Sequence, residues 1–201
     1  MIAYVETNFL LEVAYLREGH QACDAIIDLA LSKAITLVLP GFCVTEARMA
    51  WQRQAKQRSE FHEKLTAQIR ELSRSKPLAD LQDKSRELTA ALIKNSEEDR
   101  HRLDAVLQRV FQCAVIEPVS DATVKSAIDY ENSLGLSPQD SLVYVSVLQH
   151  MQSDPSAKKC FLTKNSKDFA NPDIYDELAK SQCKLLTDFE DGLNYIQRTI
   201  R

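Results

Sequence analysis

Four acidic residues lie where short β-type runs end or helical stretches begin. Glu6 ends the run IAYVE, Glu46 lies six residues past Pro40, Asp140 opens a helical stretch and Asp168 follows the run CFLT. In open parallel sheets, ligands bind outside the carboxyl ends of the strands, where loop side chains and free backbone donors gather. We therefore expect the four acids to lie close together at one edge of a sheet.

A cluster of this kind favours metal chemistry. Carboxylates gathered without compensating Lys or Arg repel one another, and burying them unpaired is costly, so such clusters normally hold a hard divalent cation. Mg²⁺ or Mn²⁺ suits an all-oxygen site, and Mg²⁺ keeps several waters, which leaves room for phosphate oxygens. One or two such ions would activate water for phosphodiester hydrolysis.

Each acid also has a structural explanation. The segment SPQD at 137–140 is a capping-box pattern with proline at the first helical position, so Asp140 taken alone is better explained as a helix cap. Glu6 fits a strand end before a capped helix, Glu46 a solvated helix face, and Asp168 a turn. The joint placement of the four acids is what favours a site.

The elements that must position these acids follow from apolar periodicity. Short apolar runs predict strands, and helical stretches separate them, which favours a mostly parallel sheet covered on both faces. Strands are expected at the start of the chain and at 35–40, 114–119, 160–163 and 183–186; helices at 8–17, 20–33, 121–133, 138–151 and 188–199. From about 43 to 109 the chain lacks glycine and has Pro77 as its one strong breaker, which predicts two antiparallel helices.

Four segments, in this order, resemble the PIN-domain nuclease family: VETNFLLE at 5–12, PGFCVTEA at 40–47, LSPQDSLVYVSV at 136–147 and FLTKNSKDF at 161–169. The resemblance covers about residues 1–47 and 118–190 and leaves out the segment between. It implies a single PIN-like α/β/α sandwich over 1–201 with a mostly parallel central sheet, carrying a helical-hairpin insertion at 48–117. It also implies cleavage of RNA with Mg²⁺ or Mn²⁺.

Carried over by motif, the resemblance implies that Glu6, Glu46, Asp140 and Asp168 are the catalytic, metal-binding quartet. Asn8, Thr163 and Asn165 would then support the ligands or orient the substrate. The chain departs from the family at two of these positions. The first strand usually ends in aspartate where this chain has Glu6, and Asn165 stands where many relatives carry another acid.

The predicted hairpin is mildly basic although the whole chain has a formal net charge of −4. Residues 47–109 hold 14 Lys or Arg against 10 Asp or Glu, which leaves 11 against 19 for the rest. Arg48, Arg53 and Lys56 follow Glu46 closely, and Lys164 lies near the fourth acid, so these basic residues are our candidates for substrate binding. Trp51 among them would stack on a base of single-stranded RNA. The alternatives are that Trp51 packs inside, that the charges form surface salt bridges, or that the hairpin binds a protein.

Other features exclude competing classes. The N-terminus lacks a basic region before its apolar stretch, and no apolar run approaches the roughly 20 residues that span a bilayer, so we expect a cytoplasmic protein without a membrane partner. The five cysteines are odd in number and scattered, without zinc spacing, and are expected to be reduced. The four histidines show no ligand spacing, and no Ser-His-Asp site is supported.

The sequence therefore predicts a metal-dependent endoribonuclease that hydrolyses phosphodiester bonds by metal-activated water. Two alternatives stay open at this stage. One is a catalytically weak PIN-like scaffold that binds RNA or a protein through the insertion. The other is a toxin-type nuclease held inactive by an inhibitory protein partner. A homo-oligomer is compatible with each of them.

Overall fold

The structure, a computed structural model, describes residues 1–75, 81–153, 155 and 157–201. At its centre is a parallel sheet of five strands in the order β3-β2-β1-β4-β5. These are β1 (Ile2–Val5), β2 (Thr36–Pro40), β3 (Ala114–Glu117), β4 (Lys159–Leu162) and β5 (Cys183–Leu186). All four residues of both β1 and β4 are buried, as expected of parallel strands covered on both faces. Each apolar run predicted to be a strand forms one.

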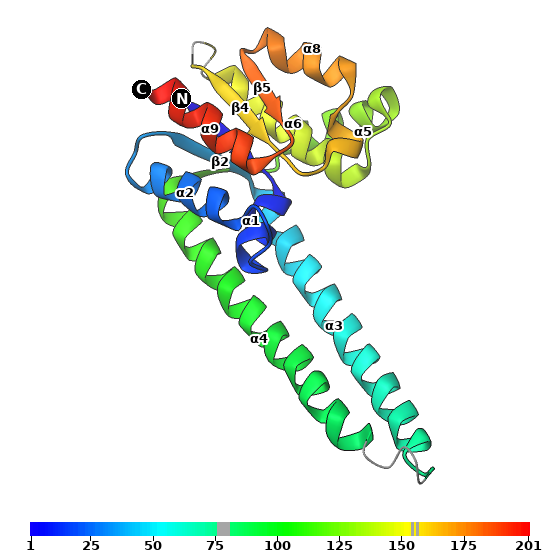
Figure 1. Ribbon diagram of the computed structural model, residues 1–201. Coiled ribbons are helices and arrows are strands. Elements are labelled where there is room, and N and C mark those ends of the chain that lie inside the picture. The colour runs from blue at the N-terminus through cyan, green and yellow to red at the C-terminus, as the bar shows by residue number, and fades with distance from the viewer. Residues whose placement is uncertain (76–80, 154, 156) are drawn as a thin grey trace.

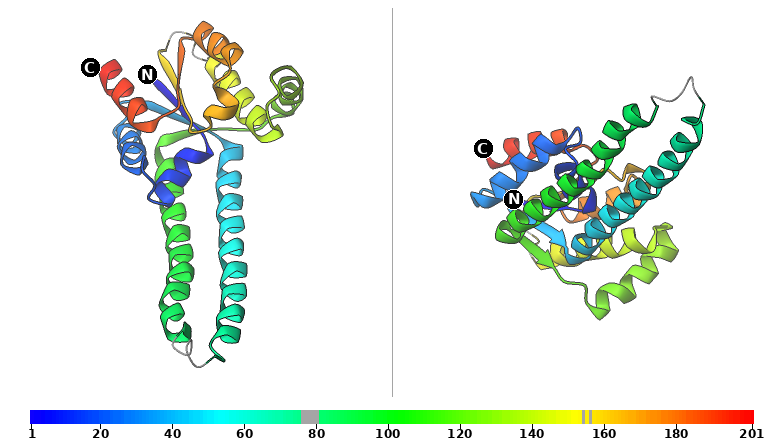
Figure 2. Two further views of the ribbon diagram at one scale, coloured as in Figure 1. Left: turned by 45° about the vertical axis from the view of Figure 1, so that its right-hand side comes forward. Right: turned by 90° about the horizontal axis from the view of Figure 1, so that it is seen from below.

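Helices cover both faces of the sheet, which gives the expected α/β/α arrangement (Figures 1 and 2). The connections from β1 to β2 and from β2 to β3 run over one face, where α9 also packs on α2. The connections from β3 to β4 and from β4 to β5 run over the other face. The helices are α1 (Thr7–Ala14), α2 (His20–Leu31), α3 (Gly41–Leu72), α4 (Leu81–Cys113), α5 (Asp121–Leu134), α6 (Pro138–Ser153), α7 (Ser166–Phe169), α8 (Pro172–Lys180) and α9 (Phe189–Ile200).

The strand order reverses between β1 and β4. From β1 the chain continues to β2, the adjacent strand on one side, whereas from β4 it continues to β5, the adjacent strand on the other side. Val5 pairs with Leu162 at the carboxyl ends of the two central strands, so Glu6 and Thr163 emerge side by side. Such a reversal is where open parallel sheets form ligand sites, because the two connections part there.

Two long helices, α3 and α4, run side by side and project from the sheet as an antiparallel hairpin (Figures 1 and 2). The predicted break at Pro77 lies outside the described residues. Trp51 on α3 links the two helices, because its Nε1 donates to the carbonyl oxygen of Ser96 on α4 at 3.0 Å. The predicted helical hairpin is therefore present.

Two helices end earlier than the sequence pattern predicts. The stretch predicted as 8–17 ends at Ala14, and the stretch predicted as 20–33 ends at Leu31. In each case a non-glycine residue just beyond takes a left-handed backbone conformation, Leu16 at φ 49° and Lys33 at φ 60°. Helices commonly end on such a residue, but glycine usually supplies it, so these ends carried no recognisable sequence signal.

The short helices α7 and α8 were not predicted. α8 begins with Pro172 after Asn171, whose side chain accepts from the backbone N–H of Asp173 at 3.0 Å. An asparagine cap followed by proline is a helix-start signal. Among the described residues, no helix is both long and apolar enough to cross a membrane.

Candidate functional site

Glu6 stands at the carboxyl end of β1 and caps helix α1. Its Oε2 accepts from the backbone N–H of Asn8 at 2.7 Å, and its Oε1 accepts from Thr163 Oγ1 at 3.0 Å and from the backbone N–H of Lys164 at 3.4 Å. The side chain is only 5% exposed. Burial raises the pKa of Glu6 from its ordinary value of 4.5 to about 7, although these hydrogen bonds lower it in part. Glu6 is therefore a buried carboxyl group held by fixed donors at the switch point.

Glu46 lies on the second turn of α3, which begins directly after β2. Its Oε2 accepts a short hydrogen bond from the hydroxyl of Thr7, the first residue of α1. Burial raises the pKa of Glu46, the negative charge of Asp140 raises it further, and the positive charge of Arg53 lowers it. The Glu46 carboxylate is thus hydrogen-bonded to α1, and its pKa responds to the charges of Asp140 and Arg53.

Asp140 lies in the first turn of α6 and takes part in the predicted cap. Its backbone N–H donates to Ser137 Oγ at 3.1 Å, and the Ser137 hydroxyl donates back to Oδ2. Its other oxygen, Oδ1, accepts from Asn165 Nδ2 at 2.9 Å. Asn165 follows β4, and its own N–H donates to Thr163 Oγ1 at 2.9 Å. Asp140 is therefore the partner of Ser137 at the start of its helix and is also tied to the loop that follows β4.

One pocket of about 250 Å³ collects these side chains from elements far apart in the sequence. Three of the four predicted acids line it, and Arg53 is the one basic side chain among the lining residues that the structure describes. The full lining is Glu6, Thr7, Asn8, Leu11, Glu46, Ala50, Arg53, Gln139, Asp140, Val143, Asn165 and Phe169. The pocket is acidic and rich in oxygen donors.

Asp168, the fourth predicted acid, does not line this pocket. It is half-buried in α7, next to Phe169, which does line it. The role of Asp168 as a ligand stays a prediction.

Of the four basic residues predicted to bind substrate, only Arg53 lines the pocket. The other three are paired with acids: Arg48 with Asp104 at 3.3 Å, Lys56 with Glu60 at 3.9 Å, and Lys164 with Asp188 at 3.3 Å. All three pairs are substantially exposed, so each ties its basic residue only weakly. Trp51 is partly buried between α3 and α4, which agrees with the packing alternative and not with base stacking.

Sequence reasoning did not assign Thr7, Gln139 or Phe169 to the site. Thr7 directly follows Glu6 in the motif ETN at 6–8. Its hydroxyl donor to Glu46 depends on how α1 and α3 pack, which no local pattern encodes.

The side chains in the pocket fit a hard divalent cation by their chemistry. The lining offers three carboxylates and the amide oxygens of Asn8 and Asn165, and none of the described lining residues is a cysteine or histidine. Burial is the main cause of the raised pKa values of Glu6 and Glu46, so their charged forms are costly in this pocket unless a cation compensates them. Among the described residues, however, no three His, Cys, Asp or Glu side chains are grouped as closely as a bound metal requires. The oxygen ligands therefore line one pocket, but their side chains are further apart than in a metal-bound site.

Comparison with known proteins gives one match. Residues 4–169 match the PIN domain, a stretch that extends from β1 through the hairpin to α7. No curated protein and no solved structure matches the chain significantly. PIN domains are generally nucleases and typically use divalent metal ions. Because the match spans most of the chain and the five-stranded parallel sheet agrees with it, the chain belongs to the PIN domain family.

Proposed function

We propose that this PIN domain is a metal-dependent endoribonuclease acting at the pocket between α1, α3 and α6. The observation that carries the proposal is the meeting of Glu6, Glu46 and Asp140 in one pocket at the switch point of the sheet. These residues come from three separate elements, and such an assembly of acids is costly unless a cation uses it.

The three carboxylates would hold Mg²⁺ or Mn²⁺. A cation bound there supplies Lewis acidity and a nucleophilic water at neutral pH. Thr163 and the backbone of Asn8 fix the orientation of Glu6, while Thr7 fixes that of Glu46. Asn165 fixes Asp140 in the same way. The protein would therefore place its ligands before the metal arrives, as supporting hydrogen bonds do in metal sites.

Single-stranded RNA is the substrate that the surroundings support best. At about 250 Å³ the pocket is smaller than the roughly 300–1,000 Å³ of sites that enclose a drug-sized ligand, so it suits a phosphodiester group better than a whole nucleotide. Arg53 would contact a phosphate at the mouth, and the exposed Arg48 and Lys56 on the same helix would contact neighbouring phosphates after exchanging their acidic partners.

The test is cleavage of a mixed-sequence single-stranded RNA with Mn²⁺, with Mg²⁺ and with EDTA. Asp140→Asn, which keeps the shape of the side chain and removes its charge, should abolish metal-dependent cutting. The proposal would be refuted if wild type still cleaved the RNA in EDTA, or if Asp140→Asn still cleaved it with metal present.

One observation favours a second candidate, a scaffold with weak catalysis that binds RNA. Both oxygens of Glu6 already accept hydrogen bonds, and its pKa of about 7 leaves much of it protonated at neutral pH. Glu6→Asp restores the residue usual in the family. An inactive wild type that gains activity through Glu6→Asp would support the scaffold over the enzyme.

A further inference from the structure

A buried ion-pair network near the middle of the hairpin lies outside the proposed site. Asp99 on α4 is 2% exposed, and both of its oxygens are paired. Oδ2 accepts from Arg58 Nη1 on α3 at 2.6 Å, and Oδ1 accepts from Arg102 Nη2 on α4 at 2.6 Å. Arg102 Nε in turn donates to the carbonyl oxygen of Ala14, the last residue of α1, at 2.8 Å. One carboxylate thus joins α1, α3 and α4.

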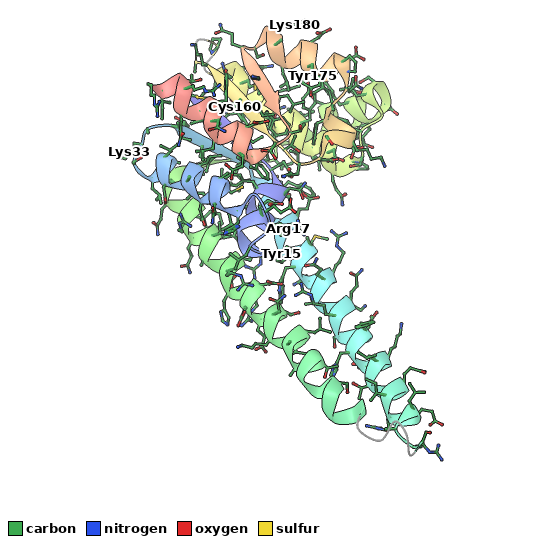
Figure 3. The ribbon with its side chains drawn as sticks, viewed as in Figure 1. Tyr15, Arg17, Lys33, Cys160, Tyr175 and Lys180 are labelled. Carbon is green, nitrogen blue, oxygen red and sulfur yellow. The ribbon has the colours of Figure 1, made fainter. Side chains whose placement is uncertain are left out.

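The surroundings of this network are closely packed. Arg58 Nη1 also donates to Ser96 Oγ at 3.0 Å, and the carbonyl oxygen of Ser96 receives the indole N–H of Trp51. Tyr15, directly after α1, lies near the same carboxylate, since burial first and then the charge of Asp99 raise the pKa of its hydroxyl. Figure 3 shows Tyr15 and Arg17 at this junction of α1 with the hairpin.

Two of the helices joined here, α1 and α3, line the active-site pocket. α1 begins with Thr7, whose hydroxyl donates to Glu46, and α3 carries Glu46 near its start. We propose that Asp99 is a positioning residue, which fixes the angle between α3 and α1 and thereby the place of Glu46 relative to Glu6. This inference rests on the proposed function, because it concerns the same site.

The geometry shows how a change at Asp99 would reach Glu46. A Cβ added to Gly41 would lie 3.1 Å from the carbonyl oxygen of Glu117, so the first residue of α3 is seated tightly against the end of β3 and acts as the pivot. Glu46 is five residues further along, about 7.5 Å at the helical rise, so a tilt of about 10° moves its backbone by about 1.3 Å. A misplacement of about 1 Å can lower a catalytic rate about 100-fold.

Two variants test the proposal against a matched control. Asp99→Asn removes the central charge, and Arg58→Met cuts only the link to α3, leaving Asp99 paired with Arg102. The control is Asp28→Asn, which breaks an exposed pair between α2 and α4 while Arg109 keeps its bond to Asp24. Each protein is measured below its unfolding temperature for Mn²⁺ affinity by calorimetry, for RNA cleavage, and for the emission of Trp51, the one tryptophan of the chain.

Arg58→Met and any folded Asp99→Asn should bind Mn²⁺ roughly 10-fold more weakly and cleave roughly 10- to 100-fold more slowly, mainly through kcat. Their Trp51 emission should shift to the red, while Asp28→Asn should behave as wild type. Folded Arg58→Met with wild-type Mn²⁺ affinity and rate would overturn the proposal, even if Asp99→Asn fails to fold, because Asp99 would then serve stability alone. If wild type binds Mn²⁺ but cuts no RNA, the proposed function fails, while weaker Mn²⁺ binding by Arg58→Met still supports positioning.

Discussion

Replacing Glu6 by glutamine should change how the stability of the metal-free protein depends on pH. Burial raises the pKa of Glu6 from 4.5 to about 7 in the folded state. The stability associated with this group is therefore fully present below pH 4.5 and is lost as pH rises through 7. At about 1.4 kcal/mol per pH unit, the loss amounts to about 3 kcal/mol between those two values. Glutamine resembles the protonated acid in shape and carries no charge, so Glu6→Gln should escape this loss.

The assay is urea unfolding of both proteins in EDTA at several values between pH 4.5 and pH 8. The difference in free energy of unfolding, variant minus wild type, cancels the titration of the other groups and should rise by about 3 kcal/mol over this range. Thr163→Val removes a donor that stabilises the charged form of Glu6. In this variant the pH-dependent loss of stability should therefore extend to higher pH than in wild type. A difference that stays flat with pH would refute the account of Glu6 as a buried acid without a cation.

Three further changes test the site and the fold. Arg53→Ala should raise the KM for single-stranded RNA and lower the slope of log K against log salt by about 0.7, the value for one lost phosphate contact, and an unchanged slope would place the substrate elsewhere. Trp51→Phe should lower stability by about 1–2 kcal/mol through loss of the hydrogen bond to Ser96, without altering RNA affinity. A variant with wild-type stability and weaker RNA binding would instead favour the interpretation that Trp51 stacks on a base. Gly192→Ala brings a Cβ to 2.7 Å from Leu162 Cδ2 and should destabilise the protein by about 1–3 kcal/mol in thermal unfolding, whereas wild-type stability would show that α9 has room to move.

The strands could be predicted because burial on both faces makes a parallel strand an uninterrupted apolar run, as in β1 and β4. The hairpin could be predicted from the long helical pattern without glycine. The order of the strands has no such signal, because it depends on which runs pair across long connections. The ends of α1 and α2 were missed because Leu16 and Lys33 take left-handed conformations that sequence patterns assign to glycine.

Within the site, the meeting of Glu6 and Glu46 follows from a simple rule, that residues after parallel strands share one edge of the sheet. Asp140 lies at the start of α6, after α5, and its place in the pocket was predicted through the family motif and not through this rule. This rule does not predict which partners the long side chains contact. Lys164 stays a predicted substrate-binding residue, but no sequence pattern indicated that its ammonium group pairs with Asp188, from the loop after β5. Pairings of this kind depend on neighbours that only the folded chain brings together.

The most direct test of the central claim, that these three carboxylates form a divalent cation site, is a Mn²⁺ titration of the metal-free protein followed by calorimetry. Wild type should bind Mn²⁺, Asp140→Asn should lose the binding, and Asp104→Asn, which removes an exposed acid on α4 outside the pocket, should keep it. Binding that survives in Asp140→Asn, or no binding by wild type, would contradict the account.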